Sequence, residues 1–398
     1  MERIAAASPI LVLMSTTFIN SATWGFYYSF TRYHVGVVLK GGAAAIGTMA
    51  GLEWALSLAS LASSAVSSLV GFRGLVLLGL SGVLPFALAL PYADNLDFLV
   101  LALPASSAPW ALAWPAVLAM ISHESVRSGR GFARTYSIST LFTGIGYGMG
   151  SFIAGAAYDA LGPRGGLALL ISIYASIFVQ AYALLLRMRE YPERRTGKRG
   201  AGSNVSLPFI IALSSVALTV AARETYYAIV PSKLERDIRK LTNATDASSG
   251  TAFSIFYSVI ASSLSIPARL LAGPIVSALG PRAVMAMSTA AWMLDFLAFS
   301  WLDGLPAILA WMVPVYPFFD TSLNTYAAGF SDDIPGSFGM ALAATSLGGL
   351  SVAILAFSTG LDVDVARRVV VVASLMSLVA LAASVLAERM GKKVQGIR

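Results

Sequence analysis

One stretch of the chain decides its fold class. Residues 250–301 read GTAFSIFYSVIASSLSIPARLLAGPIVSALGPRAVMAMSTAAWMLDFLAFSW and hold only three charged side chains. A helix that crosses a membrane needs about 20 mainly apolar residues, and this stretch supplies two such runs, 250–272 and 283–301. The Gly280-Pro281-Arg282 turn between them is short. We therefore expect a hairpin of two antiparallel membrane helices here.

The same composition continues along the whole chain. Of its 398 residues, 57% are hydrophobic and 12% are charged, and the mean hydropathy is +0.74. A soluble domain carries about 25% charged residues because its surface faces water, so most of this surface must face lipid. We expect an all-α membrane protein with about twelve transmembrane helices. The expected spans are 8–31, 43–70, 74–91, 97–121, 133–159, 165–187, 207–231, 250–272, 283–301, 304–328, 336–360 and 365–387.

Charge and cysteine content exclude several other classes of function. The net charge of +7 comes from Lys and Arg residues that stand between the apolar runs, where they orient a membrane protein, so we expect no nucleic-acid partner. The chain has no cysteine, and its two histidines, His34 and His123, are far apart. These residues offer no zinc ligand set and no catalytic cluster. We expect no metal, no cofactor and no enzymatic activity.

The basic residues also orient the spans. With an even number of spans both termini lie on one side of the membrane, and most Lys and Arg residues fall on that side. By the positive-inside rule we expect a multi-pass protein of the cytoplasmic membrane with both termini in the cytoplasm. The segment from Lys233 to Lys240 opposes this orientation, because it places four basic residues outside, although Glu235 and Asp237 stand among them.

One polar connection divides the chain near its middle. Residues 187–206 contain Pro192, several glycines and a run of Arg and Lys, which is the composition of a linker. We expect an N-terminal six-helix bundle at 1–188, a basic cytoplasmic linker at 189–206 and a C-terminal six-helix bundle at 207–398.

The two halves echo each other about 200 residues apart. Each echo alone is weak, because aromatic residues and proline are common in membrane helices. Three echoes in the same order favour two duplicated halves, and the alternative is coincidence in an apolar chain. Phe26-Tyr27-Tyr28-Ser29 corresponds to Thr225-Tyr226-Tyr227-Ala228, Trp114-Pro115 to Tyr316-Pro317, and Gly71-Phe72-Arg73 to Gly280-Pro281-Arg282.

These features resemble the major facilitator superfamily, whose members have six plus six spans and a basic linker between the halves. The family's signature, roughly G-x-x-x-D-R-x-G-R-R, follows spans two and eight. In the second copy Gly273, Gly280 and Arg282 match the signature, and Ser277 stands in the place of its Asp. The first copy retains Gly71 and Arg73. A third phrase, residues 155–164, resembles one that many members carry after span five.

The resemblance implies a monomeric secondary transporter in the lipid bilayer, with spans one, four, seven and ten around a central cavity. The missing Asp at position 277 puts in doubt the charge relay that latches the cytoplasmic gate. Span five carries Gly144, Gly146, Gly148 and Gly150, which predict close packing between the halves. In this superfamily a glycine-rich fifth span also marks drug–proton antiporters.

Ionisable side chains within spans cost about 2.5–3.5 kcal/mol on insertion scales and therefore indicate function. Asp320 lies on a cavity span and is either a proton or substrate site or a structural partner. Arg223 and Glu224 point about 100° apart on a helix. Arg223 suits an anionic substrate, because a guanidinium holds a carboxylate or phosphate bidentately. The alternative is a pair in which Arg223 and Glu224 neutralise each other.

Three further charges lie in or near spans. Glu53 either carries a proton or pairs with Arg32 or Arg223. Asp295 is on a peripheral span, so we expect a structural role. Arg269 is near a cytoplasmic helix end, where its side chain can reach the interface.

Aromatic and amide side chains gather on the expected cavity spans. Tyr27 and Tyr226 occupy equivalent places in the two halves, so we expect both to line the cavity. Trp24 and Asn20 on span one and Asn324 on span ten belong to the same surface. Aromatic residues also collect at membrane interfaces, which is the alternative explanation for many of them.

The sequence therefore predicts a secondary active transporter that works by alternating access, with a small molecule and protons as its partners. Export of small amphipathic compounds in exchange for protons is the leading interpretation, through Asp320, Glu53 or Glu224. An organic-anion symporter or exchanger that uses Arg223 is the close alternative. An alternative of another class is a membrane receptor or lipid-handling protein that transports nothing.

Overall fold

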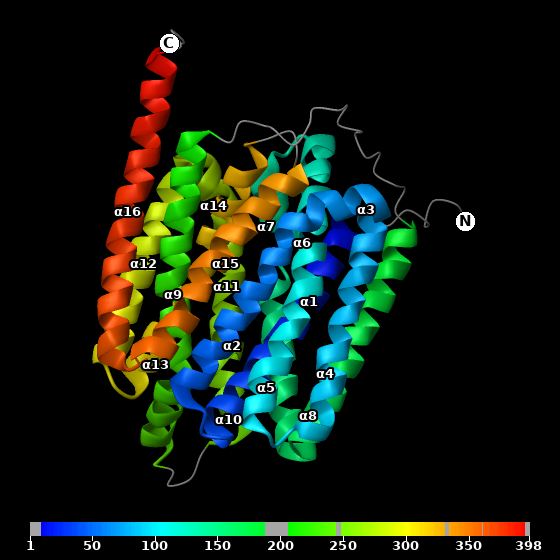
Figure 1. Cartoon of the computed structure of the whole chain (residues 1–398), viewed down its shortest axis with the longest axis vertical. Helices are drawn as coiled ribbons and strands as arrows, with labels where there is room; N and C mark the ends of the chain where they lie inside the picture. The colour runs from blue at the N-terminus through cyan, green and yellow to red at the C-terminus, as the bar shows by residue number, and fades with distance from the viewer. Residues whose placement is uncertain (1–8, 188–205, 244–247, 331–333, 360, 395–398) are drawn as a thin grey trace.

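The structure is a computed structural model that describes residues 9–187, 206–243, 248–330, 334–359 and 361–394. Its described part is a bundle of helices (Figure 1), which we divide into a first half that ends at Arg187 and a second half that starts at Leu207. The predicted linker 189–206 lies outside the described residues except for its last position. The first half contains α1 (Pro9–Thr31), α2 (Gly42–Ser57), α3 (Ser63–Gly79), α4 (Val83–Ala89), α5 (Leu96–Ala102), α6 (Ser107–Ser128), α7 (Phe132–Ser139) and α8 (Thr143–Arg187).

The second half starts at α9, which begins at Leu207. The sequence predicted the same starting residue for span seven. The start of α9 and the end of α16 lie at the same end of the molecule, the top of Figure 1. The helices of this half are α9 (Leu207–Thr242), α10 (Gly250–Ser254), α11 (Ile260–Leu279), α12 (Pro281–Trp301), α13 (Leu305–Trp311), α14 (Tyr316–Ala328), α15 (Ile334–Thr359) and α16 (Val363–Val394).

Several spans are not single regular helices. Within the described residues, seven helical stretches are by themselves long and apolar enough to cross a membrane. Other spans are built from consecutive short pieces or share one helix that bends sharply, as in α3 and α8. The all-α membrane fold predicted from the sequence is confirmed.

Three glycines form the short turns between consecutive spans. Gly71 within α3, Gly162 within α8 and Gly280 between α11 and α12 have φ angles of 68°, 68° and 83°. L-residues with a side chain rarely adopt these values, whereas glycine adopts them without a steric penalty. The repeated Gly-x-Arg motifs of the sequence are therefore three of the places where the chain reverses direction.

Small residues line the seams between the two halves. A methyl group added to Gly47 or Gly51 of α2 would meet Ala356 or Ala353 of α15. On α8, Gly155 lies against Gly250 at the start of α10. The halves therefore meet along two seams, α2 with α15 and α8 with α10 and α11. Residues without bulky side chains let the backbones approach closely at both.

Span ten is interrupted near its middle. Helix α13 ends at Trp311 and α14 begins at Tyr316, and the residues between them are not helical. Pro314 and Pro317 have no amide hydrogen to continue a helical ladder, which explains the break. In the corresponding span of the first half Pro115 lies inside the continuous helix α6, so the two halves differ at this point.

Candidate functional site

The first cluster of charges joins the end of α1 to α2. Arg32 and Glu53 are 5% and 4% exposed, and their Nη1 and Oε1 atoms are 3.3 Å apart. The hydroxyl of Tyr27 donates a hydrogen bond of 2.7 Å to the same Glu53 oxygen. The Arg32 guanidinium also lies 4.6 Å from the centre of the Tyr28 ring. Of the two partners expected for Glu53, the structure selects Arg32.

The second cluster lies in the middle of α9. Arg223 donates hydrogen bonds of 3.0 Å from Nε and 2.6 Å from Nη2 to one oxygen of Glu224. The two side chains thus neutralise each other, as the structural alternative predicts. The guanidinium also lies 5.6 to 6.0 Å from the centres of four aromatic rings, close enough for cation–π attraction. These rings belong to Trp54, Tyr227, Trp292 and Tyr316.

The third cluster is built on α14 and reaches across the boundary between the halves. The Tyr136 hydroxyl of α7 donates a hydrogen bond of 2.6 Å to Oδ2 of Asp320. The side-chain amide of Asn324, one turn further along α14, donates to Oδ1 of Asp320 over 3.1 Å and to the Tyr136 oxygen over 3.2 Å. The structure therefore brings Asp320 and Asn324 together and adds Tyr136, which the sequence did not indicate.

Arg269 of α11 lies next to this third cluster. Its side chain is 7% exposed, so the expectation that it reaches the membrane interface is wrong. Among the charged groups, its guanidinium acts most strongly on the Asp320 carboxyl, and it lies 5.9 Å from the centre of the Tyr316 ring. Within the described part of the chain, its Nε and Nη1 atoms are buried without a hydrogen-bond partner.

Tyr27 and Tyr226 are buried within their own halves, with exposures of 0% and 1%. Tyr27 packs on Phe86 with ring centres 5.6 Å apart, and Tyr226 packs on Phe296 at 4.8 Å. Neither ring lines an open surface in this conformation, contrary to the expectation. Within the described residues, the Tyr226 hydroxyl oxygen and Oδ1 of Asp295 are both buried without a hydrogen-bond partner, and the structural role expected for Asp295 stays a prediction.

Asn20 and Trp24 of α1 face α6. The Trp110 indole nitrogen donates a hydrogen bond of 2.8 Å to the side-chain oxygen of Asn20. The Trp24 ring centre lies 5.3 Å from that of Trp110 and 5.3 Å from that of Tyr27. These contacts lie between spans one and four, on the surface that the sequence assigned to the cavity.

The gate phrase after span eight has a packing role. A methyl group on Gly273 would meet the backbone of α7 in the other half. Ser277 bonds over 2.8 Å to the carbonyl of Gly273 within its own helix. Arg282 forms an ion pair with Glu388 of α16. In the phrase after span two, Gly71 makes the turn, and the side chain of Arg73 lies outside the described part.

At the opposite end of the molecule an acidic residue does bridge the halves. The Asp159 carboxylate of α8 accepts hydrogen bonds of 2.8 and 2.9 Å from the backbone amides of Gly250 and Thr251. The Thr251 hydroxyl donates a third, of 2.6 Å. Asp159 therefore caps the N-terminus of α10 from the other half, where a carboxylate is favourable. It belongs to the phrase at residues 155–164.

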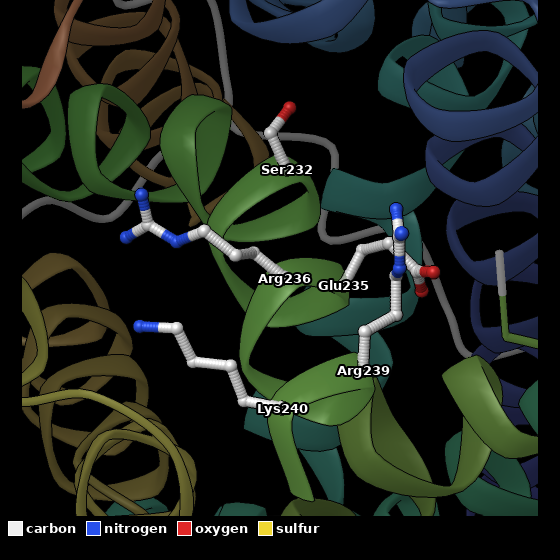
Figure 2. A pocket seen from close by; sticks show the side chains of 5 residues that line it. All are labelled: Ser232, Glu235, Arg236, Arg239 and Lys240. Carbon is white, nitrogen blue, oxygen red and sulfur yellow. The ribbon is translucent and has the colours of Figure 1, made fainter. Parts of the chain in front are cut away.

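A surface hollow of about 410 Å³ lies along the last turns of α9 (Figure 2). Arg236 and Lys240 project to one side of the helix, and both form ion pairs with Asp303. Hydrogen bonds from Lys240 and Lys233 hold the pKa of the exposed Asp303 carboxyl below its ordinary value. The basic segment that opposes the positive-inside rule is thus partly neutralised. The hollow is lined by Ser232, Glu235, Arg236, Arg239 and Lys240.

Comparison with known proteins identifies the fold. No protein-family model matches the chain, and no curated protein sequence matches it either. Among solved structures, the nucleoside transporter NupG aligns with a TM-score of 0.64 at 16% identity, over 96% of this chain and 99% of its own.

Two more solved structures give the same result. The major facilitator superfamily transporter FucP, in its outward conformation, aligns with a TM-score of 0.65 at 12% identity, over 96% and 99% of the two chains. The human organic anion transporter MFSD10 aligns with a TM-score of 0.62 at 12% identity, over 95% and 100%. The fold of this chain is that of the major facilitator superfamily.

Proposed function

We propose that this chain, which has the major facilitator fold, is a secondary active transporter coupled to protons through Asp320. It moves a small molecule across the cytoplasmic membrane by alternating access of two six-helix bundles, 1–188 and 207–398. Both termini lie in the cytoplasm, as the distribution of Lys and Arg favours. The similar structures NupG, FucP and MFSD10 are named as transporters, which supports transport in general.

The bond between Tyr136 and Asp320 is the observation that carries the proposal. It connects a carboxyl group in the middle of a span to the opposite half. A hydrogen bond to a charged carboxylate contributes about 1.5–3 kcal/mol, more than one to a neutral group. Protonation of Asp320 therefore weakens the contact between the halves on that side. The protonation state and the position of the bundles are coupled by this contact.

Two other intramembrane carboxyls, Glu53 and Glu224, are less suited to carry the proton. Glu53 is held by Arg32 and Tyr27, and Glu224 accepts two hydrogen bonds from Arg223. Each is therefore engaged in an ion pair with a neighbouring guanidinium. Asp320 has no cation within ion-pair distance in the described structure, although Arg269 lies nearby.

Proton flux in liposomes tests this proposal. The purified protein is reconstituted with a pH-sensitive dye inside the vesicles, and a compound library is screened for compounds that drive proton movement. We expect Asp320→Asn to abolish the flux, whereas Glu53→Gln and Glu224→Gln reduce it without abolishing it. Flux that persists unchanged in Asp320→Asn contradicts the proton role. No compound-driven flux or uptake at all would favour a receptor or lipid-handling protein.

The substrate class follows from the surroundings of the site. Aromatic rings around Arg223 and the Asn20–Trp110 pair suit a small amphipathic compound. Arg223 itself is committed to Glu224, so it is not the residue to hold an organic anion. An amphipathic substrate that carries a negative charge therefore requires a different cation.

A further inference from the structure

Arg269 is a buried cation whose hydrogen-bonding capacity is not used. It is 7% exposed, and its Nε and Nη1 atoms have no partner within the described residues. A buried donor without a partner costs about 1–3 kcal/mol, and more when the group is charged. A guanidinium presents its donors in a planar fork that matches a carboxylate. The free side of Arg269 therefore fits an anionic group of a ligand.

A helix terminus points to the same chemistry. Span ten is interrupted between Trp311 and Tyr316, so α14 begins inside the membrane. Pro317 near its start has no amide hydrogen, and the Phe318 amide donates to the Val315 carbonyl over 3.2 Å, so this end acts through its dipole. The N-terminal end of a helix carries a partial positive charge and favours anions. Tyr316, the first residue of α14, lies against the Arg269 guanidinium and is 43% exposed.

Two guanidinium groups and two carboxyl groups lie near the start of α14. Arg223 pairs with Glu224, and Arg269 lies near Asp320. Asp320 is also faced by the charge of Arg223 and by three uncharged groups, Tyr136 of α7 and Tyr316 and Asn324 of its own helix. The described part of α15, which also packs against α14, carries no charged residue. Asp295 is the acidic residue of α12, and its Oδ1 is buried without a hydrogen-bond partner in the described structure.

We propose that Arg269 and the N-terminus of α14 form a binding site for the carboxylate of an organic anion with an apolar body. This proposal rests on the proposed function and names the substrate class of the same site. The partly exposed ring of Tyr316 supplies apolar surface beside it. The site prefers a ligand with a single negative charge, because protonation of Asp320 leaves one positive charge, that of Arg269, without a counter-charge.

Proton and anion then bind cooperatively. With Asp320 ionised, Arg269 already has a nearby negative charge, and a second anion is repelled. With Asp320 protonated, Arg269 becomes a buried cation without a counter-charge, which is unfavourable until an anion arrives. Each ligand therefore strengthens the binding of the other, as linkage requires.

Binding of benzoate to the purified full-length protein tests the site. The midpoint of thermal unfolding is measured against benzoate concentration at about pH 6 and about pH 8, with benzyl alcohol as a neutral compound of similar shape. We expect benzoate, and not benzyl alcohol, to raise the midpoint saturably, with tighter binding at the lower pH. Phenyl phosphate should bind more weakly than benzoate, because it carries more than one negative charge near neutral pH.

Two variants move the affinity in opposite directions. Arg269→Gln should weaken benzoate binding at least about tenfold, and Arg269→Lys, which keeps the charge without the fork, should fall between. Asp320→Asn should bind benzoate more tightly than the wild type and lose the pH dependence. A merely structural role for Arg269 would not make the Arg269 variants bind benzoate more weakly while Asp320→Asn binds it more tightly.

Three outcomes overturn the proposal. They are wild-type affinity in both Arg269 variants, weaker binding in Asp320→Asn, and no saturable effect of benzoate or phenyl phosphate on the wild type. The proposed function fails separately. Benzoate binding without any proton flux in liposomes contradicts proton-coupled transport but leaves the site intact. Proton flux that is retained in Arg269→Gln, without any anion effect, contradicts only the site.

Discussion

Gly150 of α8 is a position where one methyl group decides the packing of two helices. A side chain built there would overlap the carbonyl oxygen of Ala22 in α1, and that atom belongs to the backbone and cannot turn away. We expect Gly150→Ala to destabilise the protein by about 1–3 kcal/mol, which is typical of overpacking. Thermal unfolding of the purified protein in detergent measures this as a lower midpoint.

Gly148, on the other side of the same helix, provides the matched control. A methyl group there would lie 3.5 Å from the Cβ atom of Ser262, which is an ordinary contact. Alanine is intrinsically better than glycine in a helix by about 1 kcal/mol, so Gly148→Ala should be neutral or slightly stabilising. Equal unfolding midpoints for the two variants would show that α1 and α8 are not packed as the structure has them.

At the residue scale the sequence predicted the type of chemistry better than the partners. The charges Glu53, Arg223 and Asp320 were recognisable because charged residues are rare within apolar runs. Their partners depend on how spans lie next to each other, which composition does not show. Arg269 illustrates the limit, because its distance from the predicted helix end favoured an interfacial position. Its burial against Tyr316 follows from the break in span ten.

Helix α10 is one element that connects the two halves at the end opposite the start of α9. Its first amides are capped by Asp159 of the other half, and the carboxylate is exposed to solvent, so the contact contributes only about 0.3–1 kcal/mol. Asp159→Asn removes the charge and retains most of the shape. We expect the variant to shift the equilibrium towards the outward-open state by about threefold.

Thiol labelling can measure this shift, because the chain has no cysteine of its own. Ser258 is 3% exposed and contacts Ser29 of the other half over 3.0 Å. A membrane-impermeant maleimide should label Ser258→Cys faster when Asp159→Asn is also present. Asp94→Asn is the matched control, since Asp94 pairs with Arg164 of its own half at an exposed position. Equal acceleration by both variants contradicts the capping role of Asp159.

At the element scale the turns were predictable and the helix interruptions were not. The Gly-x-Arg phrases at 71, 162 and 280 predicted the turns because only glycine adopts their backbone angles at no steric cost. Pro115 and Pro317 occur in equivalent positions of the two halves. The helix continues through Pro115, whereas span ten is interrupted just before Pro317. Proline inside a membrane helix is tolerated when neighbours satisfy the freed carbonyls, and the sequence does not reveal those neighbours.

On the scale of the whole molecule the echo between the halves reappears as equivalent contacts. Tyr27 packs on Phe86 in the first half, and Tyr226 packs on Phe296 in the second. Each pair joins the first and third spans of its half. The tyrosines are 199 residues apart and the phenylalanines 210, so these two contacts follow the repeat that the sequence suggested near 200 residues. The same contacts stiffen each bundle internally, which suits bundles that move as units.

Cross-linking the two bundles at their outer ends tests that movement. The hydroxyl oxygens of Ser29 in the first half and Ser258 in the second are 3.0 Å apart, so a Ser29→Cys/Ser258→Cys pair is placed to form a disulfide. If the halves must separate there during each cycle, oxidation should reduce compound-driven proton flux at least about tenfold, and a reductant should restore it. The control is Thr219→Cys/Ser377→Cys, whose hydroxyls are 2.8 Å apart within the second half. That cross-link should leave the flux unchanged, because both residues belong to one moving unit. Full flux in the oxidised Ser29→Cys/Ser258→Cys protein would mean that transport, if it occurs, does not open the outer seam between α1 and the start of span eight.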